Sequence, residues 1–592
     1  MEKIGQEPVI FLFRKMWRFA KGHRRWIALY LLMSAAANMV ILTQPLVFRE
    51  FLNEIQFSGF GDHNIVSLVL TLSLLLVIEF GFWAFHGPSR VIENIMAFRT
   101  EQQYRQYLLS GVLSLGLSWH SIRDSGDTID KIEKSANGLF RFASHTFLVL
   151  EVLIKAIGTT IILLFFNPFI GAIALALLTV GLFTIFQFDI RLIPQYKALN
   201  IFDNKVSARV FDSLSNITTV KVLNIEKPIF RGIRSALWAP FELFRKNKIL
   251  VEAKWFTGSL VFTLIIVIPL LVYTLFLYRN NVVVEIGTLS ALYLYLSNLL
   301  SIYFNFAGSY EEMIVNKARI ANADEIDTAI QATTRARKKP SPHWNTLALQ
   351  RVSFSYTDVG NTIPHIDSVS LQLTHGERVA LIGESGSGKT TFLKVIHGLY
   401  PDASGEIAFD DSIAHKTNFS DIALNTTLVP QEPEVFSSSI RENITLGVEY
   451  SEEEIRHATD LAQFTSVIEH LPRGLESVIN EKGVNLSGGQ KQRLALSRAL
   501  LFSADKHIIL LDESTSSVDP ETEVKIYANI FEYFKGRTII ASIHKMNLLK
   551  YFDKIVIFKD GKNVDQGTFD DLLARNKKFK RDWEEYVAEQ KR

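Results

Sequence analysis

Long apolar runs alternate with polar segments over the first half of the chain. Six of these runs reach the roughly 20 residues that a helix needs to cross a bilayer. They fall at residues 27–48, 66–85, 142–166, 169–188, 255–277 and 286–306. The third and fourth runs are separated only by Asn167 and Pro168, which predicts a tight helical hairpin. The pattern therefore predicts a six-helix, all-α transmembrane domain in residues 1–325.

Basic residues near the N-terminus predict the orientation of these spans. Six of them precede or open the first span: Arg14, Lys15, Arg18, Lys21, Arg24 and Arg25. The segment 50–65 that follows the first run contains no Lys or Arg. Because loops rich in these residues stay in the cytosol, we expect a multi-pass protein of the cell membrane with a cytosolic N-terminus. The stretch 8–21, which alternates apolar and basic residues, predicts a helix along the inner membrane surface.

The pattern changes after a charged linker at residues 326–342, which ends in Arg-Lys-Lys-Pro-Ser-Pro. Beyond it, short apolar runs between amphipathic segments predict an α/β domain in residues 343–592. The orientation of the six spans places this domain in the cytosol. Two long polar connections, after the second and fourth spans, predict helices that extend into the cytosol as well.

Composition excludes some classes of protein. At 592 residues the chain is too long for a single core. Its 63 Lys and Arg against 61 Asp and Glu leave a net charge of +2, which gives no indication of a nucleic-acid partner. The absence of cysteine excludes disulfides and thiolate metal sites. It leaves open whether the scarcity is natural or the result of deliberate removal.

The α/β domain carries a glycine-rich loop between a predicted strand and a helix, Gly-Glu-Ser-Gly-Ser-Gly-Lys-Thr at 383–390. Backbone N–H groups and a helix N-terminus converge there on anionic oxygens. Lys389 adds a positive charge near the terminal phosphates, and the Thr390 hydroxyl is placed to ligate Mg²⁺. The segment predicts a phosphate loop.

Two further segments are expected to contact the same phosphate-bearing ligand. Asp512 and Glu513 end an apolar run, so a pair of carboxylates lies at the carboxyl edge of the sheet. One can hold the water shell of a metal ion while the other activates a water; Glu513 as a metal ligand is the alternative. The signature segment, Leu-Ser-Gly-Gly-Gln at 486–490, opens a helix and presents bare N–H groups to a second anion.

This combination resembles the nucleotide-binding domain of the ABC superfamily, a P-loop ATPase, over residues 340 to about 580. In that family the signature segment of one copy closes over the ATP held by another. The loops at 119–132 and 212–226 resemble intracellular loops of type IV ABC exporters, so the resemblance extends over almost the whole chain. It implies a half-transporter with short coupling helices near 115–122 and 216–227.

The resemblance also implies roles for individual residues. Tyr356 would stack on adenine; a half-buried tyrosine at a strand end is the alternative. Gln431 would contact Mg²⁺ and sense the γ-phosphate, Asp519 would link the two sites of a dimer, and Glu513 and His544 would be catalytic. Mg²⁺ ligands would be Thr390, Gln431 and, through water, Asp512. The implied ATP-binding residues are Tyr356, Gly383, Glu384, Ser385, Gly386, Ser387, Gly388, Lys389, Thr390, Thr391, Gln431, Ser487, Gly488, Gly489, Gln490 and Asp519.

The sequence therefore predicts an ATP-driven exporter of a lipid, peptide or hydrophobic small molecule, with ATP and Mg²⁺ as cofactors. An importer built on the exporter fold and an ATP-gated channel or regulator are the alternatives; six spans argue against a soluble ABC ATPase. We expect a homodimer among membrane lipids, with a heterodimer as the alternative. Glu79, Glu151 and Lys155 lie inside predicted spans, where ionisable residues are either cargo contacts or structural pairs.

Overall fold

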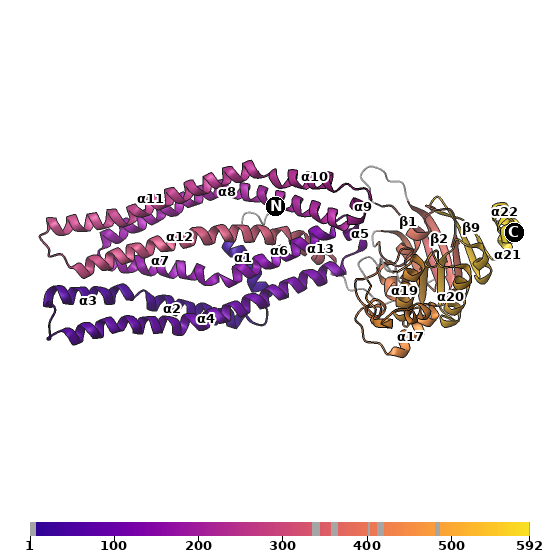
Figure 1. The fold of residues 1–592 in the computed structure, drawn as a ribbon, viewed down its shortest axis with the longest axis horizontal. Coiled ribbons are helices and arrows are strands. Elements are labelled where there is room, and N and C mark those ends of the chain that lie inside the picture. Colours follow the sequence, from indigo (N-terminus) through magenta and orange to yellow (C-terminus); the bar gives the residue numbers. More distant parts are fainter. Residues whose placement is uncertain are drawn as a thin grey trace. The chain divides into compact units, whose positions relative to one another are not determined.

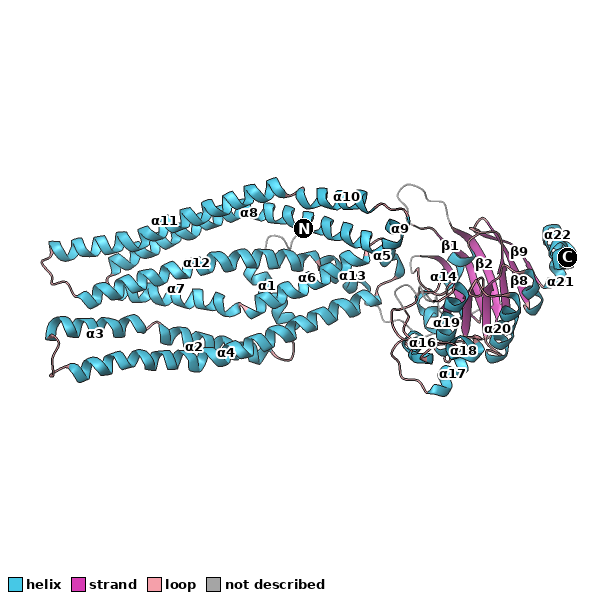
Figure 2. Ribbon diagram, viewed as in Figure 1, coloured by secondary structure: helices cyan, strands magenta, loops and turns pink. Residues whose placement is uncertain are grey.

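The computed structural model describes residues 8–333, 344–356, 365–400, 403–410, 419–479 and 486–590. Residues 334–342 of the predicted linker lie outside this part. The chain divides into two compact units: Met1–Leu115 with Ile122–Thr334, and Gly116–Ser121 with Arg335–Arg592. The described part of the first unit is entirely helical, whereas the second contains all the described strands (Figures 1 and 2).

The first unit contains twelve of the described helices. They are α1 (Pro8–Phe19), α2 (Arg24–Ile41), α3 (Gln44–Ser58), α4 (Ile65–Ser114), α6 (Ser125–Ser144), α7 (Thr146–Phe166), α8 (Pro168–Ser215), α9 (Ile217–Val222), α10 (Glu226–Trp238), α11 (Phe241–Arg279), α12 (Ile286–Asn322) and α13 (Asp324–Thr333). Short helices occur at both positions predicted for coupling helices: α9 here, and α5 (Leu117–Ser121), which groups with the second unit.

Six candidate membrane spans are present among the described residues, which confirms the predicted six-helix membrane fold. The helices continue well beyond the apolar runs, since α4 alone has 50 residues. The first span differs from the prediction of one continuous helix at 27–48. It is broken between α2 and α3, and Pro45, which has no N–H to donate, lies in the first turn of α3.

The hairpin predicted at Asn167 and Pro168 is present between α7 and α8. The Asn167 side chain accepts hydrogen bonds from the N–H groups of Phe169 and Ile170 and so caps α8. Pro168 occupies the first turn of α8, where its missing N–H costs nothing. The two residues therefore end one span and start the next.

Helix α1 is present where the amphipathic stretch predicts it, and much of its apolar side packs within the first unit while Ile10 is exposed. Its placement along the inner membrane surface stays a prediction. Phe11, Leu12 and Met16 are buried in the first unit. Lys15 is buried as well and pairs with Asp324 at 3.0 Å and with Asp327 at 3.1 Å, both on α13. The helix is thus held to the helical bundle by apolar packing and by buried charge pairs.

The three ionisable residues flagged inside the spans have partners on their own helices. Lys155 donates to Glu151 at 2.6 Å, an i,i+4 ion pair on α7. Glu79 accepts a 2.9 Å hydrogen bond from the indole N–H of Trp83, one turn further along α4. These contacts match the structural alternative, and cargo contact by these residues stays a hypothesis.

A buried ion pair that the sequence reading missed joins α8 to α11. Lys254 donates to Asp189 at 2.8 Å, and the two side chains are 1% and 3% exposed. The predicted spans ended at 188 and began again at 255, so each residue fell one position outside a span. A charge pair this deeply buried is strongly destabilised when one partner is removed.

We expect Lys254→Ala to lower the free energy of unfolding by about 3–5 kcal/mol, because Asp189 would keep its buried charge without the lysine. Denaturant unfolding of the protein in lipid nanodiscs measures this loss. The double variant Asp189→Leu/Lys254→Met should recover most of the stability, and the surface variant Lys525→Ala serves as control. Parental stability of Lys254→Ala would contradict the prediction.

The second unit contains two sheets. A small antiparallel sheet has the order β2 (Ile366–Thr374), β1 (Thr346–Phe354), β4 (Ser404–Phe409). The larger sheet has the order β5 (Thr426–Val429), β6 (Ile508–Asp512), β7 (Thr538–Ser542), β3 (Arg378–Ile382), β8 (Lys554–Lys559), β9 (Lys562–Gly567). Its strands are parallel except β9, which runs antiparallel to β8.

Every residue of β6 and β7 is buried. Along β6, Ile508 and Leu510 belong to one hydrophobic cluster while Ile509 and Leu511 belong to the other. This alternation means that the sheet has a core on each face, as parallel sheets require. Because β6, β7 and β3 are parallel neighbours, the segments that follow them emerge at one edge of the sheet.

Candidate active site

The phosphate loop joins β3 to helix α14 (Lys389–Ile396) and depends on glycine at two positions. Gly383 has φ +153°, and a Cβ there would lie 2.3 Å from the carbonyl oxygen of Phe558. Gly388 has φ +103°, and its Cβ would lie 2.9 Å from the carbonyl oxygen of His365. Neighbouring backbone therefore excludes a side chain at either position, and the loop can present its N–H groups without obstruction.

Lys389, the first residue of α14, is only 4% exposed. Its ammonium group donates to the carbonyl oxygens of Gly383 at 2.8 Å and Glu384 at 3.1 Å, so it lies under the loop. Burial lowers the pKa of this ammonium, and the carboxylates of Glu513 and Asp512 partly oppose that shift. The loop thus encloses a cation that is poorly solvated and is available to an anionic ligand.

Asp512, the last residue of β6, is buried beside the loop. The hydroxyl of Thr390 donates to its Oδ1 atom at 2.9 Å. Burial raises the pKa of the Asp512 carboxyl, whereas the hydrogen bond from Thr390 acts in the opposite direction. Asp512 and Thr390, which were named as ligands of one Mg²⁺, are therefore in direct contact within one chain.

Glu513 lies where three parallel strands end. Gln431, two residues after β5, donates from Nε2 to its Oε2 atom at 2.6 Å. His544, two residues after β7, places Nε2 at 2.7 Å from its Oε1 atom. Glu513 itself has φ +44°, a left-handed conformation that is uncommon for a residue with a side chain and that clusters at functional sites. The strand ends hold both carboxylate oxygens in place.

A cavity of about 190 Å³ lies in front of these residues. Its lining brings together His365, Ser385, Gly386, Ser387, Gly388, Lys389, Thr390, Thr391, Gln431, Glu513 and His544. The hydroxyl of Ser387 is buried and has no hydrogen-bond partner among the described residues. A buried donor without a partner is costly, so this hydroxyl fits a ligand that supplies acceptor oxygens.

The signature segment does not line this cavity within the described part of the chain. Ser487 caps helix α19 (Gly488–Leu501) by accepting from the N–H of Gln490, whose side chain accepts from the N–H of Ser487 in return. Asp519 caps helix α20 (Pro520–Tyr533) by accepting from the N–H of Thr522 at 2.9 Å, and this bond lowers the pKa of its carboxyl. Both segments have capped helix starts, and neither is among the residues that line the phosphate loop's cavity.

Tyr356 also lies outside the cavity lining. It packs among aromatic rings, with centroid distances of 4.7 Å to His365 and 5.5 Å to Tyr400. Its hydroxyl is 3.4 Å from that of Thr391 in α14. The ring is half-buried beside the loop, and its stacking on adenine remains a proposal.

Two family models match the chain. The one described as ABC transporter transmembrane region matches residues 27–301, and the one described as ABC transporter matches residues 366–516. The second match contains the phosphate loop, the signature segment and both carboxylates. The chain belongs to the ABC transporters. One membrane region followed by one ATPase domain of the ABC type confirms the predicted half-transporter of the type IV exporter class.

Several known proteins resemble this ABC transporter. ATP-binding cassette sub-family B member 6 of Mesocricetus auratus is 26% identical over 564 residues, which cover 93% of this chain and 65% of that protein. The uncharacterized ABC transporter ATP-binding protein YknV of Bacillus subtilis (strain 168) is 25% identical over 601 residues, 97% and 94% of the two chains. The chain thus spans about two thirds of the first relative and nearly all of the second.

A solved structure shares the fold. The structure of a bacterial Atm1-family ABC exporter with ATP bound superposes with a TM-score of 0.83 over 95% of this chain and 98% of that one. The two sequences are 22% identical over this alignment. The likeness therefore establishes the exporter fold.

Gln492 is a site residue of this ABC transporter that the sequence reading missed. Its side chain is 5% exposed. It donates to the carbonyl oxygen of Gln431 at 3.3 Å and accepts from the N–H of Ser517 at 2.8 Å. It therefore connects the signature helix to the segments carrying Gln431 and Asp519. A glutamine on the buried side of a helix gives no local signal of this role.

Lys545 follows His544, at the position where the family usually has an arginine. The lysine pairs with Glu523 of α20 at 2.9 Å and donates to the carbonyl oxygen of Val518 at 3.2 Å. Glu523 is 4% exposed and also accepts from Thr515 at 2.7 Å. The substitution thus keeps a cation that joins the histidine segment to the segment carrying Asp519.

The residues present fit Mg²⁺. Among the described residues no group of three or more His, Cys, Asp or Glu forms a metal cage. Mg²⁺ does not need one, because it usually keeps several waters and is held by one or two carboxylates together with substrate phosphates. Thr390 and Gln431 line the cavity, and the buried Asp512 contacts Thr390, so all three offer oxygen atoms of the required kind close to it.

We expect Lys389→Ala to weaken nucleotide binding strongly. Loss of one charge-assisted hydrogen-bonding group costs about 1.5–3 kcal/mol, or roughly 10–150-fold in affinity, and the loop would lose its only lysine. Titration with a fluorescent ATP analogue measures the change. Lys525→Ala, an exposed lysine on α20, is the matched control. Near-parental affinity of Lys389→Ala would exclude the role assigned to the loop.

Proposed function

We propose that this ABC transporter is one half of an ATP-driven exporter whose two ATP sites form between two copies of the chain. The observation that carries the proposal is the convergence of Gln431, Glu513 and His544 on the cavity that contains the phosphate loop. A phosphate loop alone would support nucleotide binding. A carboxylate held beside it by two further loops supports hydrolysis.

Each residue then has a defined task. The loop N–H groups and Lys389 neutralise phosphate oxygens, and Thr390, Gln431 and Asp512 would hold Mg²⁺, which supplies further charge neutralisation when bound. Glu513 accepts a proton from the attacking water. His544 contacts Glu513 and would transfer its hydrogen bond to the terminal phosphate when ATP is bound. Phosphoryl transfer needs mainly such positioning and electrostatic stabilisation.

We infer a dimer because the signature segment does not line the phosphate-loop cavity in the described part of its own chain. Ser487 to Gln490 present the N–H groups of a helix N-terminus, a typical anion site. Since they do not line the cavity in their own chain, a second copy would complete the site. Closure of the two copies around ATP would move α5 and α9, and hydrolysis would reverse that motion, a rigid-body form of alternating access.

The cargo is expected to be a lipid, a peptide or a hydrophobic small molecule, and the names of related proteins do not select among them. One relative, of Leuconostoc mesenteroides, is named Mesentericin-Y105 transport/processing ATP-binding protein MesD, and another, of Caenorhabditis elegans, is named Heavy metal tolerance factor 1. We place the protein in the cell membrane with the N-terminus and the ATPase domain in the cytosol.

A transport assay in inside-out vesicles tests this function. Vesicles containing the protein are incubated with a panel of labelled lipids, peptides and drugs, with and without ATP. Export predicts ATP-dependent accumulation inside the vesicles. ATP-dependent loss of preloaded cargo would identify an importer, and flux that needs ATP but no hydrolysis would identify a gated channel.

We expect Glu513→Gln to retain ATP binding and to hold two ATPase domains closed, with turnover reduced by about 10²–10⁴-fold, the usual cost of losing a positioned general base. Steady-state phosphate release and a binding titration measure the two effects. Glu521→Gln, the same exchange at an exposed position of α20, is the control. Turnover within a few-fold of the parent would exclude Glu513 as the base.

We expect the active unit to be a homodimer with two equivalent ATP sites, because Gln431, Glu513, His544, the phosphate loop and the signature segment are all intact in one chain. The mass and ATP turnover of the protein, purified alone in lipid nanodiscs, test this. A monomer, or a dimer that stays inactive until a second protein is added, would contradict it.

A further inference from the structure

The phosphate loop carries a negative charge of its own. Glu384, its second residue, has a side chain that is 81% exposed. The carbonyl oxygen of the same residue accepts from Lys389, so Glu384 is part of the loop that surrounds that lysine. The proposed ligand of the loop is a polyanion, and a carboxylate beside it opposes binding by charge repulsion.

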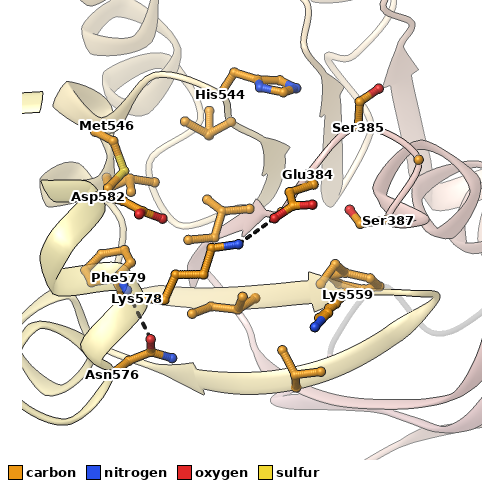
Figure 3. A pocket seen from close by; sticks show the side chains of 18 of the residues that line it. Glu384, Ser385, Ser387, His544, Met546, Lys559, Asn576, Lys578, Phe579 and Asp582 are labelled. Carbon is orange, nitrogen blue, oxygen red and sulfur yellow. Dashed lines mark hydrogen bonds and ion pairs between the residues drawn. The ribbon is translucent and has the colours of Figure 1, made fainter. Parts of the chain in front are cut away.

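A lysine from the C-terminal end of the chain neutralises this carboxylate. Lys578 donates to Glu384 at 2.5 Å, across 194 residues of sequence. The pairing lowers the pKa of the Glu384 carboxyl and raises the pKa of the Lys578 ammonium. Figure 3 shows the lysine side chain extending from its helix to Glu384, with Lys559 on the same side of the loop.

The start of the C-terminal helix is fixed in place, so the position of Lys578 is determined. Asn576, between α21 (Phe569–Arg575) and α22 (Lys577–Gln590), accepts from the N–H of Phe579 at 3.0 Å and donates to Asp565 at 2.9 Å. Phe579 is 3% exposed. The ring of Trp583 lies 4.9 Å from that of Phe569. The buried Phe579 and the capped first turn hold Lys578 toward the loop.

Between the loop and α22 lies a cavity of about 430 Å³. Gly383 to Ser387 line one side, and Asn576, Lys578, Phe579 and Asp582 line the other (Figure 3). The loop and the helix are therefore not joined by close packing there. Among the described residues, the hydrogen bond from Lys578 to Glu384 is the one that joins the loop to the helix.

We propose that Lys578 is a positioning residue for nucleotide binding, which neutralises Glu384 and so makes the C-terminal helix part of the nucleotide site. The inference rests on the proposed function, because it assumes that the loop binds ATP. The match to the ABC transporter family model ends at residue 516, so α22 lies outside the matched segment. A lysine from outside the matched segment thus offsets the negative charge of Glu384.

The test uses the full chain in lipid nanodiscs and compares Lys578→Ala, Lys578→Arg, Glu384→Gln and the double variant Glu384→Gln/Lys578→Ala. Lys577→Ala, an exposed neighbour on the same helix, is the matched control. The affinity for a fluorescent ATP analogue and the KM and kcat for ATP are measured at low and high salt. Thermal unfolding of each variant without nucleotide reports its stability.

We expect Lys578→Ala to raise KM about three- to tenfold at low salt with kcat unchanged, since the carboxylate would then face the phosphates without its ion-pair partner. Lys578→Arg should match the parent, and Glu384→Gln should bind ATP at least as tightly as the parent. The double variant should recover parental affinity. The defect should shrink at 1 M salt, where the screening length is about 3 Å.

An unchanged KM in Lys578→Ala would overturn the inference. A double variant whose affinity for ATP is as low as that of Lys578→Ala would also overturn it, because the defect would then not depend on the charge of Glu384. A reduced kcat with unchanged KM would overturn it as well. A parent that fails to bind ATP would overturn the proposed function and this inference together. If the parent binds ATP and Lys578→Ala changes neither affinity nor KM, the inference is overturned while the proposed function stands.

Discussion

The parallel pairing of β6 with β5 and β7, in a sheet with a core on each face, is the constraint on which the active site depends. Because β6 and β7 are fully buried, their polar ends can lie only where the strands leave the core. Asp512, Glu513 and His544 occupy those ends, next to the loop that follows β3. The apolar interior thus fixes the geometry of the site.

The buried lysines of the two units have different kinds of partner. In the membrane unit the buried Lys254 pairs with Asp189, and the buried Lys15 pairs with two aspartates of α13. In the ATPase unit Lys389 is buried against carbonyl oxygens and faces a cavity. The first two lysines are satisfied by carboxylates, as buried ions require. Lys389 has only neutral acceptors, and its charge is therefore available to a ligand.

The sequence predicted features that local spacing determines. Six apolar runs, the turn at Asn167 and Pro168, the phosphate loop and the residues at strand ends all follow from contiguous segments. Contacts between elements distant in sequence were not predictable. Asp189 with Lys254, Gln492 with Ser517 and Glu384 with Lys578 lie 65, 25 and 194 residues apart, and neither partner carries a signal of the other. The break before Pro45 was missed because hydropathy does not report backbone hydrogen bonding.

The contacts of Glu513 suggest how arrival of a phosphate could release the base. A neutral histidine carries one ring proton, so His544 must hold it on Nε2 to donate to Glu513. The same proton cannot be donated to a phosphate at the same time. A phosphate oxygen that takes this hydrogen bond would free Oε1 of Glu513, while Gln431 keeps hold of Oε2. The carboxylate would then be oriented yet have an open acceptor for water, so occupancy of the cavity would itself prepare the base.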